Sequence, residues 1–248
     1  MLLECGLCQI MSKLLQFIIL VCERQRMITF NRNIKKAITL AELLMALMII
    51  GVLYMLAIPV IEKVELDRNK EAARVAFSIF SQATIKVLQD KGGNLKGVFS
   101  SSQDILNAYL PYLNVQKSCN LAEVSGNCFH AKREFRYLNN EPYPYQALNN
   151  SSSGMILSNG FLVNIYTNNA STCFTDSFPD HCADITVDIN GWSRPNRIGY
   201  DIFVYVIYPD RLVPMPKSIS SCIYPPDAGW DGATNHGWGC TEDIIMGR

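Results

Sequence analysis

The sequence predicts an α+β fold: one long N-terminal helix packed on a small antiparallel β-sheet, followed by an irregular C-terminal region held by disulfides. An apolar run from Ile38 to Ile61 passes without a break into an amphipathic stretch that ends near Asp90. The second half of the chain carries short β-branched and aromatic runs separated by turn residues. Six cysteines follow the helical stretch, an even number that is typical of disulfide-bonded exported domains.

The apolar run predicts a membrane-spanning helix. From Ile38 to Ile61 it is long enough to cross a hydrocarbon core of about 30 Å at about 1.5 Å per residue. Its single charged side chain is Glu42. Burying a carboxylate in such a segment costs roughly 2.5 kcal/mol or more, so we expect Glu42 to have a functional partner.

The residues around this run resemble the N-terminal motif of the type IV pilins and the type II secretion pseudopilins. In that family a short basic leader is removed in front of a hydrophobic residue, which is followed by Thr-Leu and by Glu at the fifth place. Here Ala37 lies at the cut, Ile38 opens the mature chain and Glu42 is fifth. Ala37 replaces the usual glycine, and Pro59 corresponds to a proline common at the twenty-second mature position. The resemblance covers roughly residues 32 to 90.

This resemblance implies a pilin-like fold and a structural role without enzymatic activity. Prepilin peptidase would cut between Ala37 and Ile38, and Ile38 would be N-methylated. The mature chain would be a single-pass protein of the cytoplasmic (inner) membrane with an extracytoplasmic domain. It would then join other pilin or pseudopilin subunits in a cell-surface or periplasmic helical filament, through the inner-membrane assembly platform. In the family, the fifth-residue glutamate is thought to meet a new N-terminal amine, and Glu42 and Pro59 are the corresponding assembly residues here.

The resemblance also divides the chain. Residues 1–37 are interpreted as the leader, 38–61 as the transmembrane half of the helix and 62–248 as the extracytoplasmic domain. Residues 1–26 fit a leader poorly, and we interpret them as a misassigned start, with Met27 as the expected first residue and Met11 as the alternative. The machine remains open between an adhesive or motile pilus, a DNA-uptake pilus and a secretion pseudopilus. The large, disulfide-rich domain favours a minor subunit.

Charge and histidine content bear on the other function classes. The 22 basic and 22 acidic residues balance, and no Lys/Arg cluster follows the apolar run, so we expect membrane lipid but no nucleic acid among the partners. The three histidines, His130, His181 and His236, lie in no recognisable hydrolase or metalloprotease motif. The alternative function is a signal-anchored extracytoplasmic binding or enzymatic domain that does not assemble into a filament.

The six cysteines after the cut form three sequence-local couples. Because closing a short loop costs less entropy than closing a long one, we predict the pairs Cys119–Cys128, Cys173–Cys182 and Cys222–Cys240. Zinc is the rival explanation, since His181 adjoins Cys182 and His236 lies near Cys240. No Cys-x-x-Cys pair occurs after the cut, which disfavours zinc.

Periodicity and turn residues predict the individual elements. After Pro59 the apolar residues form one helical stripe: Val64, Ala72, Val75, Ala76, Ile79, Phe80, Ala83, Val87 and Leu88. Lys91-Gly92-Gly93 ends this helix. Serines predict the start of a second helix over residues 102–113, which Pro111 ends early. A hairpin over 155–167 turns at Asn159-Gly160, two strands follow over 183–189 and 201–208, and residues 209–248 are expected to be irregular.

The turn between the last two predicted strands is a candidate metal site. Asp188, Asn190 and Asp201, with Pro195-Asn196 between the last two, supply hard oxygen atoms around Asn190-Gly191, which is the ligand chemistry that Ca²⁺ prefers. The spacing is not that of an EF-hand loop. The surrounding segment is similar to one found in pilin-like ectodomains, and major pseudopilins carry a calcium ion in a C-terminal loop. The alternative is an Asn-Gly turn that joins two strands and is capped by Asp188.

Overall fold

The computed structural model describes residues 40–131, 134–143, 151–167, 170–173, 180–219, 222 and 236–247. The chain divides into two compact units, Met1–Pro59 and Val60–Arg248. The predicted leader, with Ala37 and Ile38, lies outside the described residues. Glu42 and Pro59 lie within a described helix, although their side chains are outside the description.

The predicted long helix is present as α2, which spans Leu40–Asp90 and has 51 residues. In the first unit its described large apolar side chains are exposed, with exposed fractions from 37% at Ile58 to 68% at Met48. By length and composition, α2 is the one helix in the described part of the chain that is long and apolar enough to cross a membrane. These properties are consistent with a single-pass membrane protein.

In the second unit, α2 packs on the sheet through a face of mostly small residues. The buried positions follow the helical period: Asn69, Ala73, Ala76, Phe80, Ala83, Thr84 and Val87. The predicted stripe was wrong at Val64 and Val75, which are 56% and 51% exposed. The buried face includes Thr84, whose hydroxyl donates to the Phe80 carbonyl oxygen and lies 2.7 Å from the Tyr109 hydroxyl. A stripe predicted from hydrophobicity alone therefore includes exposed residues of α2 and omits the buried Thr84.

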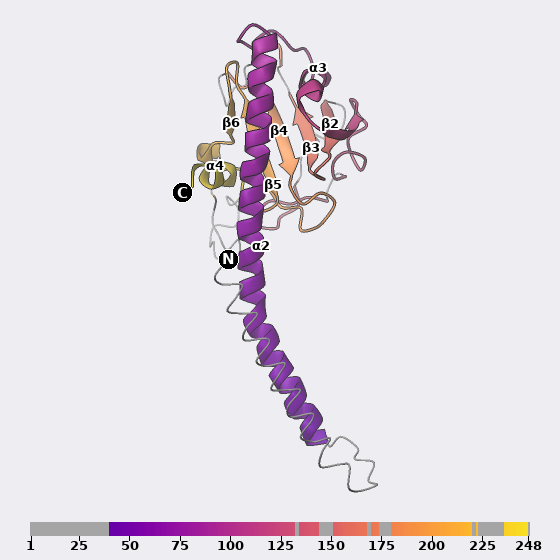
Figure 1. The fold of residues 1–248 in the computed structure, drawn as a ribbon, viewed down its shortest axis with the longest axis vertical. Helices are drawn as coiled ribbons and strands as arrows, with labels where there is room; N and C mark the ends of the chain where they lie inside the picture. The colour runs from indigo at the N-terminus through magenta and orange to yellow at the C-terminus, as the bar shows by residue number, and fades with distance from the viewer. Residues whose placement is uncertain are drawn as a thin grey trace. The chain divides into compact units, whose positions relative to one another are not determined.

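The sheet is a six-stranded antiparallel meander in the order β1-β2-β3-β4-β5-β6 (Figure 1). Its strands are β1 Val115–Cys119, β2 Ser152–Leu157, β3 Leu162–Tyr166, β4 Ala183–Asp188, β5 Ile202–Ile207 and β6 Leu212–Pro214. The predicted hairpin forms between β2 and β3, with Gly160 at φ +89° in its turn. β2 to β5 lie where the sequence predicts strands, whereas the two edge strands, β1 and β6, were not predicted.

Alternation along the strands places apolar side chains on both faces of the sheet. Val163, Ile185 and Tyr205 belong to the main core that includes the α2 face. Their neighbours Leu162 and Ile202 belong to a second cluster, with Val124 and Phe129 from the segment between β1 and β2. Both faces of the sheet are thus covered by apolar side chains, and the polar loops lie at the ends of its strands.

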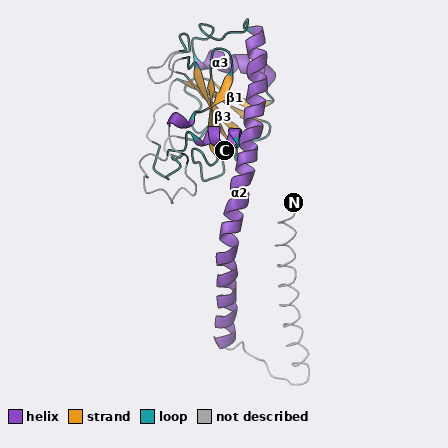
Figure 2. Ribbon diagram, turned by 90° about the vertical axis from the view of Figure 1, so that its left-hand side faces the viewer, coloured by secondary structure: helices purple, strands orange, loops and turns teal. Residues whose placement is uncertain are grey.

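The predicted second helix is α3, Ser102–Tyr109, followed by the 3₁₀ turn η1, Leu110–Tyr112 (Figure 2). Ser101 caps its start and Pro111 lies where the α-helix gives way, as predicted. The tail is more regular than expected, because it contains β6, the 3₁₀ turn η2, Lys217–Ile219, and the helix α4, Cys240–Met246.

Three disulfides hold the second unit: Cys119–Cys128, Cys173–Cys182 and Cys222–Cys240. These are the pairs predicted from the sequence. Because the six cysteines are consumed as disulfides, they are not thiolate ligands, and the zinc alternative loses its sulfur donors.

Candidate functional sites: the apolar helix and the β4–β5 loop

The first candidate site is the apolar part of α2. From Leu44 to Ile61 the helix carries no charged residue, and its described side chains are largely exposed. A helix that is apolar on all sides needs a non-aqueous environment or partner helices, because water penalises each exposed apolar surface. Glu42 lies in the same helix, two residues before Leu44. The geometry thus fits a segment made to be buried in lipid or in a helical bundle.

The second candidate site is the loop that connects β4 to β5. Asp188 ends β4, Asp201 directly precedes β5, and both side chains are completely buried at 0% exposure. The structure brings together the three residues that the sequence singled out: Asn190 contacts Asp188 through its backbone and Asp201 through its side chain. We refer to residues 189–200 as the β4–β5 loop.

Asp188 caps the turn that follows it. Its Oδ1 accepts a hydrogen bond from the Asn190 backbone N–H at 3.0 Å, and its Oδ2 lies 2.9 Å from the Nε2 of His130. Burial raises the pKa of this carboxyl, while the contact with His130 opposes the rise. This is the capped Asn-Gly turn that the sequence analysis gave as the alternative to a metal site, with Gly191 at φ +68°.

Asp201 holds the other side of the same loop. Its carboxylate accepts hydrogen bonds from the backbone N–H groups of Asn196 and Arg197 and from the side-chain amide of Asn190. Burial, and next the charge of Asp188, raise the pKa of Asp201 to about 7. Among the described residues no basic side chain forms an ion pair with Asp201.

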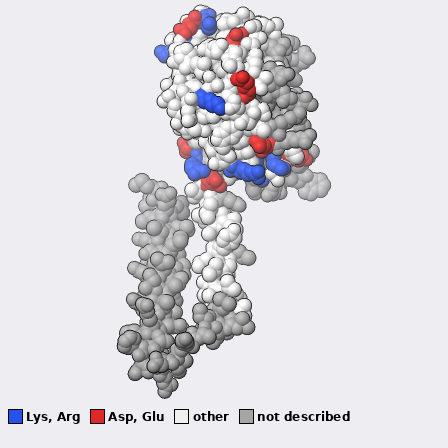
Figure 3. All heavy atoms as spheres, turned by 90° about the vertical axis from the view of Figure 1, so that its right-hand side faces the viewer, with Lys and Arg blue, Asp and Glu red and all other residues white. Residues whose placement is uncertain are grey.

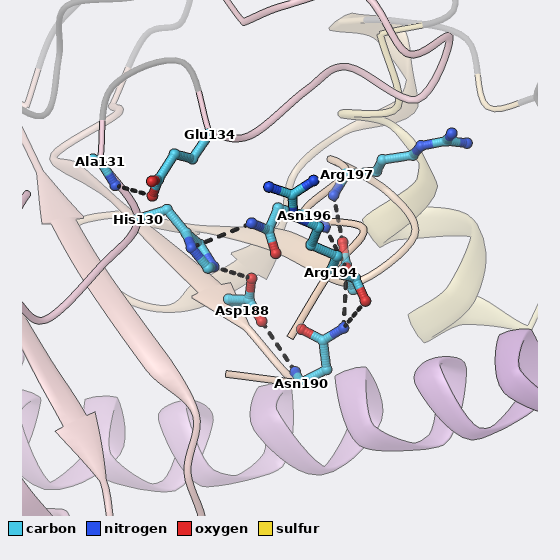
Figure 4. A network of polar contacts seen from close by, with 9 residues as sticks. His130, Ala131, Glu134, Asp188, Asn190, Arg194, Asn196 and Arg197 are labelled. Atoms are coloured by element: carbon cyan, nitrogen blue, oxygen red, sulfur yellow. Dashed lines mark hydrogen bonds and ion pairs between the residues drawn. The ribbon is translucent and has the colours of Figure 1, made fainter. Parts of the chain in front are cut away.

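Two amide oxygens of this loop are buried without a hydrogen-bond partner: Oδ1 of Asn190 and Oδ1 of Asn196. Figure 4 shows the Asn196 side chain next to His130 and the Asn190 side chain on the other side of Asp188. Within the described part of the chain, no group of three or more His, Cys, Asp or Glu side chains is placed to hold a metal ion. Any cation here would therefore have to be bound largely by amide and carboxylate oxygens, which is calcium chemistry.

The role of His130 was not predicted from the sequence. His130 is 2% exposed and its Nδ1 lies 3.3 Å from the Asn196 side-chain nitrogen. Its partner Asp188 is 58 positions away in the chain, so no local spacing could reveal the contact. Asn196 belongs to the oxygen-rich turn singled out in the sequence, because Pro195-Asn196 stands close before Asp201 in a run of turn residues.

The other two histidines have separate surroundings. His181 lies 2.8 Å from Asp184, and the ring of His236 stacks on Tyr137 with centroids 4.1 Å apart.

Comparisons of the chain with family models, with curated proteins and with solved structures found no significant match. Functional assignment consequently rests on the chemistry of the two candidate sites.

Proposed function

We propose that this chain is a pilin-like structural subunit, of the minor kind, of a type IV pilus or a type II secretion pseudopilus. It would be processed by prepilin peptidase between Ala37 and Ile38, N-methylated on Ile38 and assembled through α2. One observation carries the proposal: a single helix of 51 residues is apolar and exposed in its first part and packs into a domain core in its last part. Such a helix suits a subunit that passes from a bilayer into a bundle of like helices.

Glu42 gives the proposal its mechanism. In an apolar bundle the Glu42 carboxylate would pair with the amine that cleavage creates at Ile38, either its own or that of a neighbouring subunit. Solvent barely screens such a pair, and removing one partner leaves the other charge buried and unpaired at a cost of about 3–5 kcal/mol. The pairing would therefore stabilise only subunits that have been cleaved and that pack in the correct register.

The decisive experiment is to express the precursor with and without a prepilin peptidase and to determine the N-terminus of the product by mass spectrometry. A product that begins at Ile38 supports the proposal, and methylation of Ile38 strengthens it. An uncut chain, or one cut after Pro59, contradicts it. Either of these outcomes would favour the alternative, a signal-anchored extracytoplasmic domain that binds or transforms a ligand and works without its helix.

We also propose that the β4–β5 loop binds Ca²⁺. The supporting observation is that Asn196, at 5% exposure, and Asn190 each have a buried amide oxygen without a hydrogen-bond partner, in a loop flanked by the buried carboxylates of Asp188 and Asp201. Asp188, Asn190 and Asn196 are the ligands we favour. Asp201, which the sequence analysis included, accepts three N–H donors and would act mainly by charge.

Calcium binding is tested by the thermal midpoint of unfolding, measured with CaCl₂ and with MgCl₂. Because a ligand stabilises by RT ln(1 + [L]/Kd), binding predicts a midpoint about 4 °C or more higher in calcium at 100 times Kd. Asn196→Ala should remove the difference. Equal midpoints in calcium, magnesium and a chelator would contradict the proposal and leave the capped turn as the whole role of the loop.

A further inference from the structure

The β4–β5 loop displays an exposed tryptophan. Trp192 is 51% exposed, and the two residues that follow it, Ser193 and Arg194, are exposed as well. Indole is a large apolar group with one hydrogen-bond donor, so leaving it in water is unfavourable, and such side chains concentrate at binding surfaces. The position of the loop in the second unit indicates which surface Trp192 contacts.

The loop that carries Trp192 is held rigidly. Asp201 fixes it through three N–H donors, and the rings of Trp192 and His130 form a T-shaped pair with centroids 5.3 Å apart. Gly191 lies so close to the β2–β3 turn that a Cβ there would be 2.9 Å from the Gly160 carbonyl oxygen. Trp192 is thus presented in one position, which lowers the entropy cost of binding.

The loop lies at one particular end of the second unit. At the other end, the backbone N–H of Leu95, just after α2, donates to the carbonyl oxygen of Pro209, just after β5. Since β5 runs toward that end, its first residues and the last of β4 lie at the opposite end, beside the earlier turns of α2 (Figure 1). The hydroxyl of Tyr205 donates to the Ala73 carbonyl oxygen at 2.7 Å, which fixes the level of β5 against α2.

Distances along the chain place this end near Val60, where the second unit begins. Ala73 comes about 20 Å after Val60 at 1.5 Å per helical residue. Asp201 comes about 13 Å before Tyr205 at 3.3 Å per strand residue. The β4–β5 loop extends beyond Asp201, which brings it level with the first turns of α2 in this unit. Val60 and Ile61 are the last residues of the apolar part of α2, so the chain connects this end of the unit directly to that part.

The chemistry of this end suits a lipid surface. Tryptophan is enriched where bilayers meet water, and an exposed arginine can bind a lipid phosphate through paired N–H donors. In the view of Figure 3, basic and acidic side chains mix along the lower rim of the second unit. Such mixed charge disfavours a polyanion such as nucleic acid, which needs a continuous basic surface.

We propose that the β4–β5 loop is a membrane-surface contact in which Trp192 enters the lipid headgroup region and Arg194 binds lipid phosphate before the subunit is assembled. This inference rests on the membrane anchorage in the proposed function. The contact would hold the second unit against the bilayer, and extraction into a filament would have to release it. The β4–β5 loop would then be a second lipid-binding element besides α2.

The test is lipid quenching of Trp192 fluorescence in the full chain. Trp230→Phe and Trp238→Phe leave Trp192 as the sole tryptophan. The protein is reconstituted in vesicles of phosphatidylethanolamine and phosphatidylglycerol that contain a headgroup spin-labelled lipid. The matched control carries Trp192→Phe as well, and Val98→Trp supplies its sole tryptophan. Val98 is 38% exposed and lies close to Leu95 at the other end of the unit. We expect quenching at position 192 to be about twofold or more that at position 98.

Arg194→Ala should lower the quenching at position 192, and near-UV circular dichroism verifies that each variant is folded. Vesicle flotation separates the two proposals. Protein that does not float with the vesicles contradicts membrane anchorage, and the inference fails with it. Protein that floats but shows equal quenching at positions 192 and 98 overturns the inference alone and leaves the proposed function intact.

Discussion

His181 and Asp184 form a partly buried acid–base contact at the start of β4, with 2.8 Å between Nε2 and Oδ1. Burial lowers the pKa of His181, but the hydrogen bond and the charge of Asp184 outweigh burial and raise the pKa above its usual value near 6.5. The folded chain therefore binds this proton more tightly than the unfolded chain. The stabilising contribution is fully present below about pH 6.5 and is lost as the pH rises through the raised pKa.

We predict that the free energy of unfolding, measured by urea denaturation, includes a contribution from this pair at pH 6 that is absent at pH 8.5. The Asp184→Asn variant should lack that contribution, so its difference from the parent should shrink as the pH rises. Asp210→Asn is the control, because Asp210 is exposed and pairs with Arg211 rather than with a histidine. A loss at Asp184 that is the same at both pH values would contradict the prediction.

Tyr205 ties the sheet to the long helix through one hydrogen bond. Its side chain is fully buried, and its hydroxyl donates to the Ala73 carbonyl oxygen. Tyr205→Phe keeps the ring packing against Phe77 and removes only the donor, so we expect a loss of about 1 kcal/mol in the free energy of unfolding. Tyr208→Phe, which changes a partly exposed tyrosine directly after β5, should change the free energy of unfolding by less than about 0.5 kcal/mol. Equal effects would mean that the hydroxyl of Tyr205 does not stabilise the contact with α2.

At the scale of elements, α3 is the clearest case of local specification. The Ser101 hydroxyl accepts from the Asp104 N–H while the Asp104 carboxylate accepts from the Ser101 N–H, which is a complete capping box. Ser101→Ala should lower the free energy of unfolding by about 1 kcal/mol in thermal or urea denaturation. Ser171→Ala, at an exposed turn position, is the control. A loss of less than about 0.3 kcal/mol at Ser101 would contradict the importance of the cap.

Elements differ in how much of their structure is visible in the sequence. β2 to β5 were predicted because their β-branched runs and the Asn159-Gly160 turn are local signals. β1 was missed because Gln116, Lys117 and Ser118 are polar and exposed, so the strand exists only through backbone pairing with β2. α4 was missed because its contacts are distant: Thr241 accepts from the Val204 N–H, and the Ile244 carbonyl oxygen accepts from the Arg74 side chain. Tertiary contacts of this kind leave no pattern in a short window.

The same limit applies to the candidate sites. Asp188, Asn190 and Asp201 were found together because the loop that holds them is continuous in the chain. His130 completes the cluster from another part of the chain, and Trp192 became significant only when its exposure and its place at the end of the sheet were known. For α2 the reverse holds, since its length and apolar character were evident from composition, and the structure adds that the helix is continuous from Leu40 to Asp90.

At the scale of the whole molecule, the proposed filament depends on a charge in the apolar part of α2. Glu42→Gln keeps the size of the side chain and removes its charge, so insertion into the membrane should be unchanged or slightly easier. Cleavage between Ala37 and Ile38 should also proceed. Assembly should fall by about tenfold or more, because the cleaved amine would be left unpaired within the apolar bundle.

The measurement compares three quantities for the same expressed protein: the membrane-bound fraction, the cleaved fraction and the fraction recovered in sheared filaments. Glu71→Gln is the matched control, because it makes the same chemical change in the same helix at an exposed position where the carboxylate pairs with Arg74. We expect Glu71→Gln to assemble normally, since exposed pairs contribute only about 0–1 kcal/mol. If Glu42→Gln entered filaments as well as Glu71→Gln, the pairing mechanism would be wrong, and assembly would have to depend on the apolar surface of α2 alone.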